Sequence, residues 1–442
     1  MLKAFLTKIS VLKKTDILLL VIALCFAGKL LIINNYKSPA DDFAPIYVAA
    51  RLVAEGKATS IYDHHPHLQH TVPPGEFKET AEKIGFRGFL HPYVHLPLEA
   101  FLLRPLLFIP YHLVIKIVLL INILAVLFSL HLILKLTGRG YDLRWFSLAI
   151  LAMCYFYPLR YGLWQGHHSP LVFLGITSVC YLARYGYPKT SGCILGGIIS
   201  IKILPLFFVF YFLIKKKWAL VLSSLITLIA IGSCSVWLVG GESNLLFIRT
   251  LTQLIGFSLA SWNNQSLDGV LLRLTSDSLY IFDWHLLELS FIMMIVKYVI
   301  LSSMLVLWLI ILIRPTNPNE KNRDLLDFSL TLIFTVIFAP ISWSHYLLSF
   351  TFPYIVLLGT LAQSKTIPYR TLMISGVFLS YLAAALSPLY LLTSVNLPLV
   401  NKVPPSFLSS LGFLSGILLI TIILSYTILI SKTSREIGHS SR

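Results

Sequence analysis

The chain has 442 residues, of which 57% are hydrophobic and only 12% are charged. A soluble protein carries about 25% charged residues, so this composition excludes an ordinary soluble domain and predicts repeated membrane crossings. The formal net charge is +16. Because the basic residues lie mostly in short loops between apolar runs, they indicate a membrane topology with basic cytoplasmic loops rather than nucleic-acid binding.

Apolar runs of membrane-spanning length recur along the chain. We predict about twelve transmembrane helices, near residues 16–33, 111–136, 145–161, 169–184, 190–202, 204–214, 218–239, 286–313, 325–341, 346–362, 371–391 and 406–430. The apolar segment 94–110 is short and is interrupted by Glu99, Arg104 and two prolines, so we expect it to enter the membrane without crossing it. The predicted fold is an all-α integral membrane bundle that forms one domain over residues 1–442.

The distribution of Lys and Arg orients this bundle. With the N-terminus in the cytoplasm, every short loop assigned to that side is basic, whereas the outside turns near 162–168 and 342–345 carry no Lys or Arg, as the positive-inside rule requires. We therefore expect a multi-pass protein of the inner or plasma membrane with both termini cytoplasmic. The long extracytoplasmic loops are then 34–93 and 240–285, and residues 363–442 add C-terminal spans.

The first long loop carries three aspartates in a strongly basic chain, Asp41, Asp42 and Asp63. Asp42 is the candidate general base, because a carboxylate beside Phe43 and near a membrane surface can have its pKa raised to a useful value. The sequence leaves Asp41 open as the base instead. Both residues could alternatively solvate the loop or cap the helix that follows.

That helix is predicted over Ile46–Glu55. Its apolar positions Ile46, Ala49, Ala50 and Val53 fall on one face, so we expect the helix to lie along the membrane surface on that face. Gly56 is expected to end it.

Four further polar clusters lie at span ends or in outside loops of this topology. They are Trp164-Gln165-Gly166-His167-His168, Lys202, Asn263-Asn264-Gln265-Ser266 and Ser342-Trp343-Ser344-His345. Together with Asp41, Asp42 and Tyr47 they meet at one membrane face, as an enzyme acting on a lipid-borne substrate requires. A carboxylate can deprotonate an attacking hydroxyl, and cations or histidines can hold a departing phosphate.

Each of these clusters also has a purely structural interpretation. Lys202 could extend its ammonium group to the membrane interface, and His345 could form interfacial hydrogen bonds. Gln165, His167 and His168 could complete a helix end, and the Asn264-Gln265-Ser266 run could be an ordinary helix N-cap.

Metal ligands are sparse apart from one histidine-rich stretch. His64, His65, His67 and His70 could bind zinc or copper, although Pro66 interrupts their helical spacing. We expect no metal and no cofactor, and the histidine-rich stretch remains open. The five cysteines lie in apolar runs and predict packed thiols rather than disulfides. Lys297, deep in the span 286–313, is expected to pair with a group inside the bundle.

Six segments of the chain resemble, in order, the motifs of bacterial glycosyltransferase family 87. They are DFAPIYVAARLVAEGKATSIYD from Asp42, HPYVHLPLEAFLLRPLLFIPY from His91, WQGHHSPLVFLGI from Trp164, SIKILPLFFVFYFLIKKKW from Ser200, NNQSLDGVLLRL from Asn263 and SWSHYLLSFTFPYIVLL from Ser342. The resemblance runs from about residue 16 to 362. His91-Pro92-Tyr93 departs from the family's Tyr-Pro-Pro pattern, and His167-His168 stand where Asn is common, so the identity of the sugar is not transferred.

The resemblance implies a GT-C fold with its active site at the outer membrane face. It implies a polyprenyl-phosphate sugar donor, commonly of mannose or arabinofuranose, and a cell-envelope glycolipid or glycan as acceptor. Carried over, the acceptor-activating base falls on Asp42, the histidine near the donor phosphate on His345, and the lysine of the Lys-x-x-Pro motif on Lys202. The other expected substrate contacts are Asp41, Tyr47, Arg51, Gln165, His167, His168, Asn264, Gln265 and Trp343.

A lipid or solute transporter is the alternative from a different class. Transporters place polar substrate groups near the bilayer midplane, often between inverted repeats. Here the polar clusters gather at one surface and no pair of matching halves is evident. A central cavity near Lys297 would favour transport, and a groove beside Asp42 would favour the enzyme. Acceptor identity and oligomeric state remain open.

Overall fold

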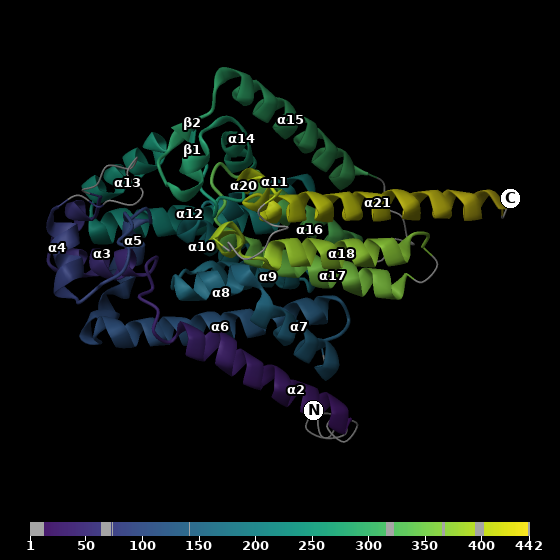
Figure 1. Cartoon of the computed structure of the whole chain (residues 1–442), viewed down its shortest axis with the longest axis horizontal. Coiled ribbons are helices and arrows are strands. Elements are labelled where there is room, and N and C mark those ends of the chain that lie inside the picture. The colour runs from purple at the N-terminus through teal and green to yellow at the C-terminus, as the bar shows by residue number, and fades with distance from the viewer. Residues whose placement is uncertain are drawn as a thin grey trace.

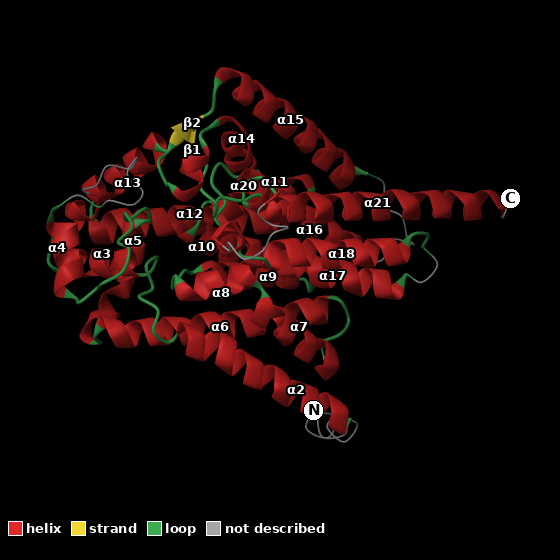
Figure 2. Cartoon of the chain, in the orientation of Figure 1, coloured by secondary structure: helices red, strands yellow, loops and turns green. Residues whose placement is uncertain are grey.

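The computed structural model describes residues 13–62, 72, 74–140, 142–314, 322–364, 367–393 and 402–440. Nearly all of this chain is helical, which confirms the predicted all-α class (Figure 2). Within the described residues the sheet structure is limited to one short antiparallel pair, β1 (Phe257–Ser258) and β2 (Leu287–Glu288).

The helices differ widely in length along the chain. They are α2 (Lys14–Ala27), α3 (Ala44–Ala54), α4 (Glu76–Lys83), α5 (Pro97–Leu103), α6 (Tyr111–Leu136), α7 (Leu143–Tyr155), α8 (Tyr157–Trp164), α9 (Ser169–Arg184), α10 (Pro188–Ile201), α11 (Phe207–Ile214), α12 (Trp218–Val239), α13 (Gly241–Gln253), α14 (Leu267–Thr275), α15 (Phe291–Ile313), α16 (Arg323–Ile337), α17 (Thr351–Gln363), α18 (Arg370–Ala385), α19 (Pro388–Thr393), α20 (Pro405–Leu408) and α21 (Leu411–Ser440). Short 3₁₀ or π turns occupy Gly28–Ile32, Ile33–Asn35, Ala58–Tyr62, Arg104–Phe108, Leu204–Leu206, Ser278–Phe282 and Ser344–Phe350.

Six stretches of the described chain are long and apolar enough to cross a membrane. They are Lys14–Asn35, Tyr111–Leu136, Trp218–Val239, Phe291–Ile313, Ser344–Gln363 and Leu411–Ile430. The pair α7 and α8 makes a seventh if its 63° bend is counted within one span. The predicted count of about twelve is not confirmed, because α9, α10, α11, α16 and α18 have between 8 and 16 residues, whereas about 20 are needed to span the hydrocarbon core.

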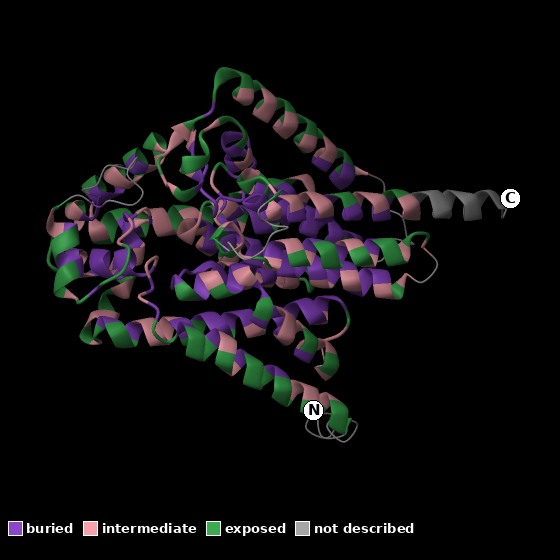
Figure 3. Ribbon diagram, in the orientation of Figure 1, coloured by how far each residue is buried: buried purple, intermediate pink, exposed green. Residues whose placement is uncertain are grey.

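Peripheral and central helices differ clearly in burial (Figure 3). Every residue of α16 except Asp324 is buried, whereas α2 and α15 lie at the edges of the bundle and expose apolar side chains such as Leu18, Phe291 and Val299. The start of α2 and the end of α21 lie at one end of the molecule, and α3, α4, α5 and α13 lie at the opposite end (Figure 1). Apolar outward faces are what a lipid environment requires of spanning helices.

The segment 94–110 does not form a spanning helix. Its helix α5 has 7 residues, which is about 10 Å at the α-helical rise of 1.5 Å per residue, and the 3₁₀ turn Arg104–Phe108 follows directly. The segment is therefore too short to cross, as predicted.

The helix of the first long loop corrects one expectation. α3 covers nearly the predicted residues, and Gly56 follows it with φ +78°, which suits glycine just after a helix end. However, Val48, Ala49, Ala50 and Leu52 are all fully buried while Val53 is half-buried. The predicted one-sided apolar face is wrong, because α4, α5 and the turn Ala58–Tyr62 enclose the helix.

The interior pairing predicted for Lys297 is confirmed. Its Nζ lies 2.6 Å from Oδ2 of Asp268 in α14, and both side chains are largely buried. The five cysteines are free thiols, as predicted, but only Cys154 and Cys180 are packed in the interior, whereas Cys25, Cys193 and Cys234 are exposed on the helices that carry them.

A single buried carboxylate joins the basic ends of three helices. Asp327 in α16 lies 2.7 Å from Nζ of Lys215, 3.2 Å from Nη1 of Arg314 and 3.6 Å from Nε of Arg323, and its side chain is 1% exposed. These three cations come from loops that the charge pattern assigns to the same side of the membrane. The structure therefore brings the basic residues of these loops together at one end of the bundle.

Replacing Asp327 with asparagine is expected to lower the free energy of unfolding by about 3–5 kcal/mol, because three largely buried cations lose the carboxylate that they share. Unfolding by SDS in mixed micelles measures the change. Asp324→Asn is the matched control, since Asp324 is an exposed carboxylate one turn earlier in the same helix. Equal stability of the two variants would contradict the proposed structural role of Asp327.

Candidate functional site

The loop between α2 and α3 is fastened to the end of α8. The Ser38 hydroxyl donates to the carbonyl of Trp164, and the Asp42 amide donates to the carbonyl of Gln165 at 2.9 Å. Two polar clusters that are more than 120 residues apart in the sequence therefore form one surface.

A close backbone contact also depends on Gly166. This residue has φ +66°, and a Cβ placed there would lie 2.6 Å from the Cβ of Ala40 and 3.1 Å from the Cβ of Phe43. A larger residue would thus suffer both backbone strain and a steric clash. Gly166 is what allows the turn after α8 to approach the aspartate loop.

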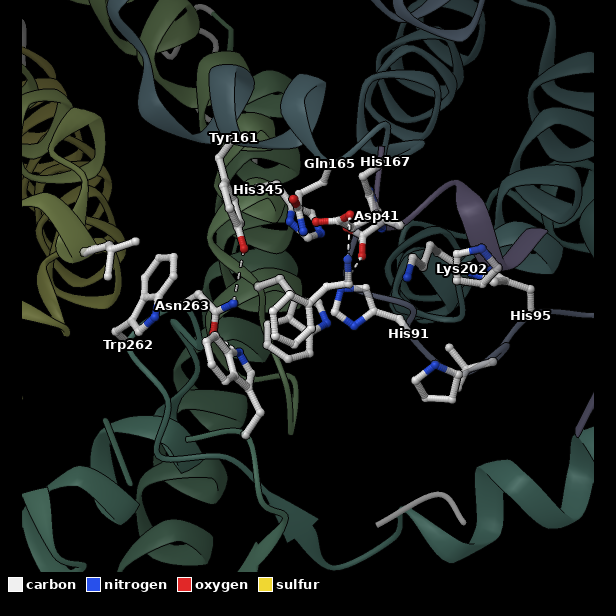
Figure 4. A pocket seen from close by; sticks show the side chains of 18 residues that line it. Asp41, His91, His95, Tyr161, Gln165, His167, Lys202, Trp262, Asn263 and His345 are labelled. Atoms are coloured by element: carbon white, nitrogen blue, oxygen red, sulfur yellow. Dashed lines mark hydrogen bonds and ion pairs between the residues drawn. The ribbon is translucent and has the colours of Figure 1, made fainter. Parts of the chain in front are cut away.

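A cavity of about 370 Å³ opens beside this loop (Figure 4). Figure 4 shows Lys202 and His95 on one side of the cavity and Trp262 and Asn263 on the other. The predicted site residues that line it are Asp41, Asp42, Gln165, His167, Lys202, Trp343 and His345. These residues come from four of the six segments that resemble the family motifs, and His91 and Asn263, which also line the cavity, come from the other two.

Asp42 lies at the centre of this group. Ligand-type atoms of Asp42, His167 and His345 all lie within 4.8 Å of one another, and Nε2 of His91 is 3.8 Å from Oδ1 of Asp42. Burial raises the pKa of the Asp42 carboxyl, an effect that His91 and Lys202 partly oppose electrostatically. A buried carboxylate of this kind is suited to accept a proton.

The carboxylate of the neighbouring Asp41 accepts a hydrogen bond from the backbone. Its Oδ1 accepts a hydrogen bond of 3.0 Å from the backbone N–H of Phe89, which ties the aspartate loop to the segment before α5. Burial also raises the pKa of Asp41. Because one Asp41 oxygen is occupied by the backbone, the geometry favours Asp42 over Asp41 as the proton acceptor.

Two stacked imidazoles face Asp42. The backbone N–H of Ser169 donates to Nδ1 of His167 at 2.8 Å, so in the neutral ring the proton resides on Nε2. The rings of His167 and His345 are 4.0 Å apart between centroids. His345 is 4% exposed, and neither of its ring nitrogens has a hydrogen-bond partner within the described structure, which leaves both available to a ligand.

Lys202 supplies the cavity with a cation. It follows α10 in extended conformation (φ −142°, ψ 127°), and its Nζ lies 5.3 Å from the centroid of the Tyr346 ring. This contact and the lining of the cavity place the ammonium group near the Asp42 group rather than at the outer surface.

Lys202 also connects the cavity with an apolar space. A narrow pocket that it lines continues to Leu204 and Thr335. These two residues in turn line a pocket of about 470 Å³ between α11, α15 and α16, whose walls are almost entirely apolar. The narrow pocket therefore joins the two spaces: it shares Lys202 with the cavity at Asp42, and Leu204 and Thr335 with the apolar pocket.

Some predicted contact residues do not line the cavity. The Tyr47 hydroxyl donates to the carbonyl of Ile109 at 2.8 Å, and the Gln265 amide donates to the carbonyl of Ser409 at 2.8 Å. The Asn264 side chain donates to the carbonyl of Leu259. Tyr47, Arg51, His168, Asn264 and Gln265 all lie outside the lining, and their contact with substrate stays a prediction.

Asn264 and Gln265 instead connect two of the predicted clusters. The Oδ1 of Asn264 accepts from the amide of Ser342 at 2.9 Å, and Asn264 forms an isolated β-bridge with Trp343. The amide of Ser344 also donates to the carbonyl of Asn263 at 2.8 Å. This pairing builds the wall of the cavity that carries Asn263, Trp343 and His345.

Several lining residues were missed in the sequence as site candidates. They are His91, His95, Tyr161, Trp262 and Trp284. His91 and His95 lie within the segment that resembles the family's second motif, so these could have been included. Asn263, which also lines the cavity, belongs to a cluster that the sequence did single out. Trp284 carried no signal in the sequence; it lines the cavity, and its Nε1 donates to Oδ1 of Asn263 at 3.2 Å.

Two groups of side chains could hold a metal ion in the part of the chain that the structure describes. One is Asp42, His167 and His345, and the other is His95, Glu99 and His168. Asp63 and the histidine-rich stretch His64, His65, His67 and His70 lie outside the described residues.

The comparisons with known proteins bear on this site. Residues 93–340, more than half of the chain, match the family model of glycosyltransferase family 87. Asp42 lies well before the matched residues and His345 shortly after them, whereas Gln165, His167 and Lys202 lie inside them. A comparison with curated proteins gives no significant match. With several apolar helices of spanning length as well, the chain belongs to glycosyltransferase family 87 and is a membrane glycosyltransferase.

Proposed function

We propose that the protein transfers a sugar from a polyprenyl-phosphate donor to a hydroxyl of a cell-envelope glycolipid or glycan. The observation that carries the proposal is the shared cavity: Asp42, Lys202 and His345 line it together. Mannose and arabinofuranose are the sugars that the family resemblance favours. The reaction takes place at the extracytoplasmic face of the cell membrane, with both termini in the cytoplasm.

The apolar pocket behind Lys202 supports a lipid donor. A polyprenyl phosphate has one charged group at the end of a long hydrocarbon chain, and Lys202 lies between the polar cavity and the route towards the pocket at α11, α15 and α16. A soluble nucleotide sugar has no chain to fill such a space. The arrangement therefore favours a donor whose phosphate group binds at Lys202 and whose polyprenyl chain lies in the apolar pocket.

The proposed reaction is a single displacement with inversion. Asp42 accepts the proton of the acceptor hydroxyl while that oxygen forms a bond to the anomeric carbon of the donor sugar. The bond between the anomeric carbon and the phosphate oxygen breaks, and the polyprenyl phosphate leaves with the electron pair. Lys202 and His345 stabilise the negative charge on the phosphate, so the step requires no metal ion.

Aromatic side chains favour a carbohydrate acceptor. Trp262, Trp284 and Trp343 line the cavity, and Trp262 lies on the side opposite Lys202 (Figure 4). The edge-to-face packing of Trp262 on Trp284 fixes two of these rings. Flat apolar rings with polar edges suit the faces of sugar rings. Asp42 lines the same cavity as these rings and Lys202, so an acceptor hydroxyl and a donor sugar could both reach it there.

Replacing Trp343 with alanine is expected to raise the KM for the acceptor roughly tenfold, about the upper value for one aromatic contact, with a smaller change in kcat. The reason is the loss of one sugar-stacking surface while Asp42 and Lys202 stay in place. Initial rates at varied acceptor concentration measure the effect. Trp237→Ala is the control, because Trp237 is 81% exposed on α12. An unchanged acceptor KM would contradict the proposed acceptor site.

The rate is also expected to depend on the protonation of Asp42. A general base works only when it is deprotonated, so kcat/KM should fall as the pH drops through the Asp42 pKa. Burial raises that pKa above the ordinary value of 3.8, so the acidic limb should have its midpoint above pH 3.8. Rates across the pH range, with size-exclusion profiles to exclude unfolding, measure the limb. A rate that stays constant down to pH 3.8 would contradict the assignment.

The transporter alternative finds less support. A transporter is expected to have a central cavity near Lys297. Lys297 is instead paired with Asp268, and it does not line the cavity at Asp42. The polar cavity instead contains the proposed base.

Donor class is the most direct test of the proposed function. Purified protein in liposomes is given a membrane glycolipid extract as acceptor. One set of reactions contains polyprenyl-phosphate mannose or polyprenyl-phosphate arabinofuranose as donor, and the other contains the corresponding nucleotide sugars. Transfer from a polyprenyl-phosphate sugar is expected. Transfer from nucleotide sugars alone would refute the lipid-donor proposal.

A further inference from the structure

We propose that His95, Glu99 and His168 form a binding site for a divalent transition-metal cation of the Zn²⁺ type. The three residues come from two elements: His95 and Glu99 flank the start of α5, and His168 directly precedes α9. Their ligand-type atoms all lie within 4.8 Å of one another. This site is separate from the Asp42 group and does not depend on the proposed transfer reaction.

The distances within the group suit a shared ion better than direct hydrogen bonds. Nδ1 of His95 lies 3.4 Å from Oε2 of Glu99, and Nδ1 of His168 lies 4.0 Å from Oε1 of the same carboxylate. Such contacts are long for hydrogen bonds. Zinc binds imidazole nitrogen and carboxylate oxygen at about 2.0–2.2 Å, which places neighbouring ligand atoms of a tetrahedron about 3.4 Å apart.

Unpartnered buried atoms provide independent support. Oε2 of Glu99 and Nε2 of His168 are buried and have no hydrogen-bond partner in the described chain. The His95 and His168 residues are only 9% and 8% exposed. Burying such atoms without a partner is unfavourable, and a bound cation would compensate this cost for the carboxylate.

The surrounding structure holds the ligands in place. The Tyr62 hydroxyl donates to the carbonyl of His95, and the rings of His95 and His168 lie 5.1 Å apart in an edge-to-face arrangement. Two imidazoles and one carboxylate are the protein ligands of several zinc sites that keep a fourth position open. His95 also lines the cavity, so the site adjoins the space where substrate would bind.

The charge of Lys202 predicts a direction of change in metal affinity, which a cluster with a purely structural role would not show. Its ammonium acts electrostatically on both His95 and Glu99, and it therefore opposes a second cation. Removing this charge with Lys202→Gln should tighten metal binding, whereas removing a ligand should weaken it.

Metal titration of the purified full-length protein tests the site. The protein is stripped with a chelator, and Zn²⁺ is titrated in competition with a chromophoric chelator, with elemental analysis for stoichiometry. We expect one high-affinity equivalent per chain and a rise of the thermal midpoint on binding. Glu99→Gln and His168→Gln should each weaken binding by at least about 100-fold and abolish the thermal shift.

Two matched variants keep the test decisive. His131→Gln removes a histidine of α6 outside both candidate groups and should leave Zn²⁺ binding unchanged. Asp42→Asn should also leave it unchanged, and a loss of binding in that variant would assign the ion to the other group. No stoichiometric binding by the wild-type chain, or unaltered binding by folded Glu99→Gln, would likewise overturn the proposal.

Discussion

Asp42→Asn is expected to reduce kcat for sugar transfer by about 10²–10⁴-fold, the usual contribution of a general base. Asparagine has nearly the same shape as aspartate but cannot accept the proton of the acceptor hydroxyl. The fold should be preserved, because the Asp42 backbone amide keeps its bond to Gln165. Single-turnover rates with a polyprenyl-phosphate sugar measure the loss separately from donor binding.

Asp41→Asn is the matched control for this experiment. Asp41 lines the same cavity, but its carboxylate accepts the backbone N–H of Phe89, a hydrogen bond that the Asn oxygen can also accept. Its kcat should fall by less than tenfold. If Asp41→Asn abolished transfer while folded Asp42→Asn remained active, the base would have to be Asp41.

Lys202→Gln should lower kcat by about 10²–10³-fold, the size of effect seen when one preorganised stabilising group is lost at a developing charge. Lys202 is the cation at the boundary between the cavity and the narrow pocket that leads to α11, α15 and α16. Glutamine can still donate a hydrogen bond to phosphate but brings no charge. Because phosphate carries more negative charge after the sugar has left, kcat should fall more than donor affinity.

The control for Lys202 is Arg249→Gln. Arg249 is an exposed cation of α13 that does not line the cavity, so its replacement should change kcat by less than about threefold. Steady-state kinetics of the two variants at saturating acceptor make the comparison. Equal rates in wild type and Lys202→Gln would show that the leaving phosphate is held elsewhere.

The positions of most helices could be predicted from the sequence, including the short α9 at 169–184, but which of them are long enough to span a membrane could not. The predicted spans 111–136 and 218–239 coincide with α6 and α12, because a long, uniformly apolar run has clear ends. Residues 145–161 instead form α7 and α8 with a 63° bend, where Pro158 opens the second helix. α16 has 15 residues and is buried by its neighbours. The sequence shows that this run is apolar, but it does not show that other helices, rather than lipid, surround it.

Predictions for the site divide in the same way. Asp42, Lys202 and His345 stand out because charged or imidazole groups beside apolar runs are costly without a function, and the structure places all three around one cavity. Asn264 and Gln265 looked equally suitable for binding sugar, but their amides bond to the backbone. The sequence could not distinguish these uses, because the same amide groups serve both.

The most direct test is a structure of the full-length protein with a bound non-transferable polyprenyl-phosphonate sugar. The account predicts the phosphonate oxygens within hydrogen-bond distance of Lys202, the anomeric carbon facing Asp42, and the lipid chain in the apolar pocket between α11, α15 and α16. A phosphonate bound away from Lys202, with its sugar remote from Asp42, would contradict the account.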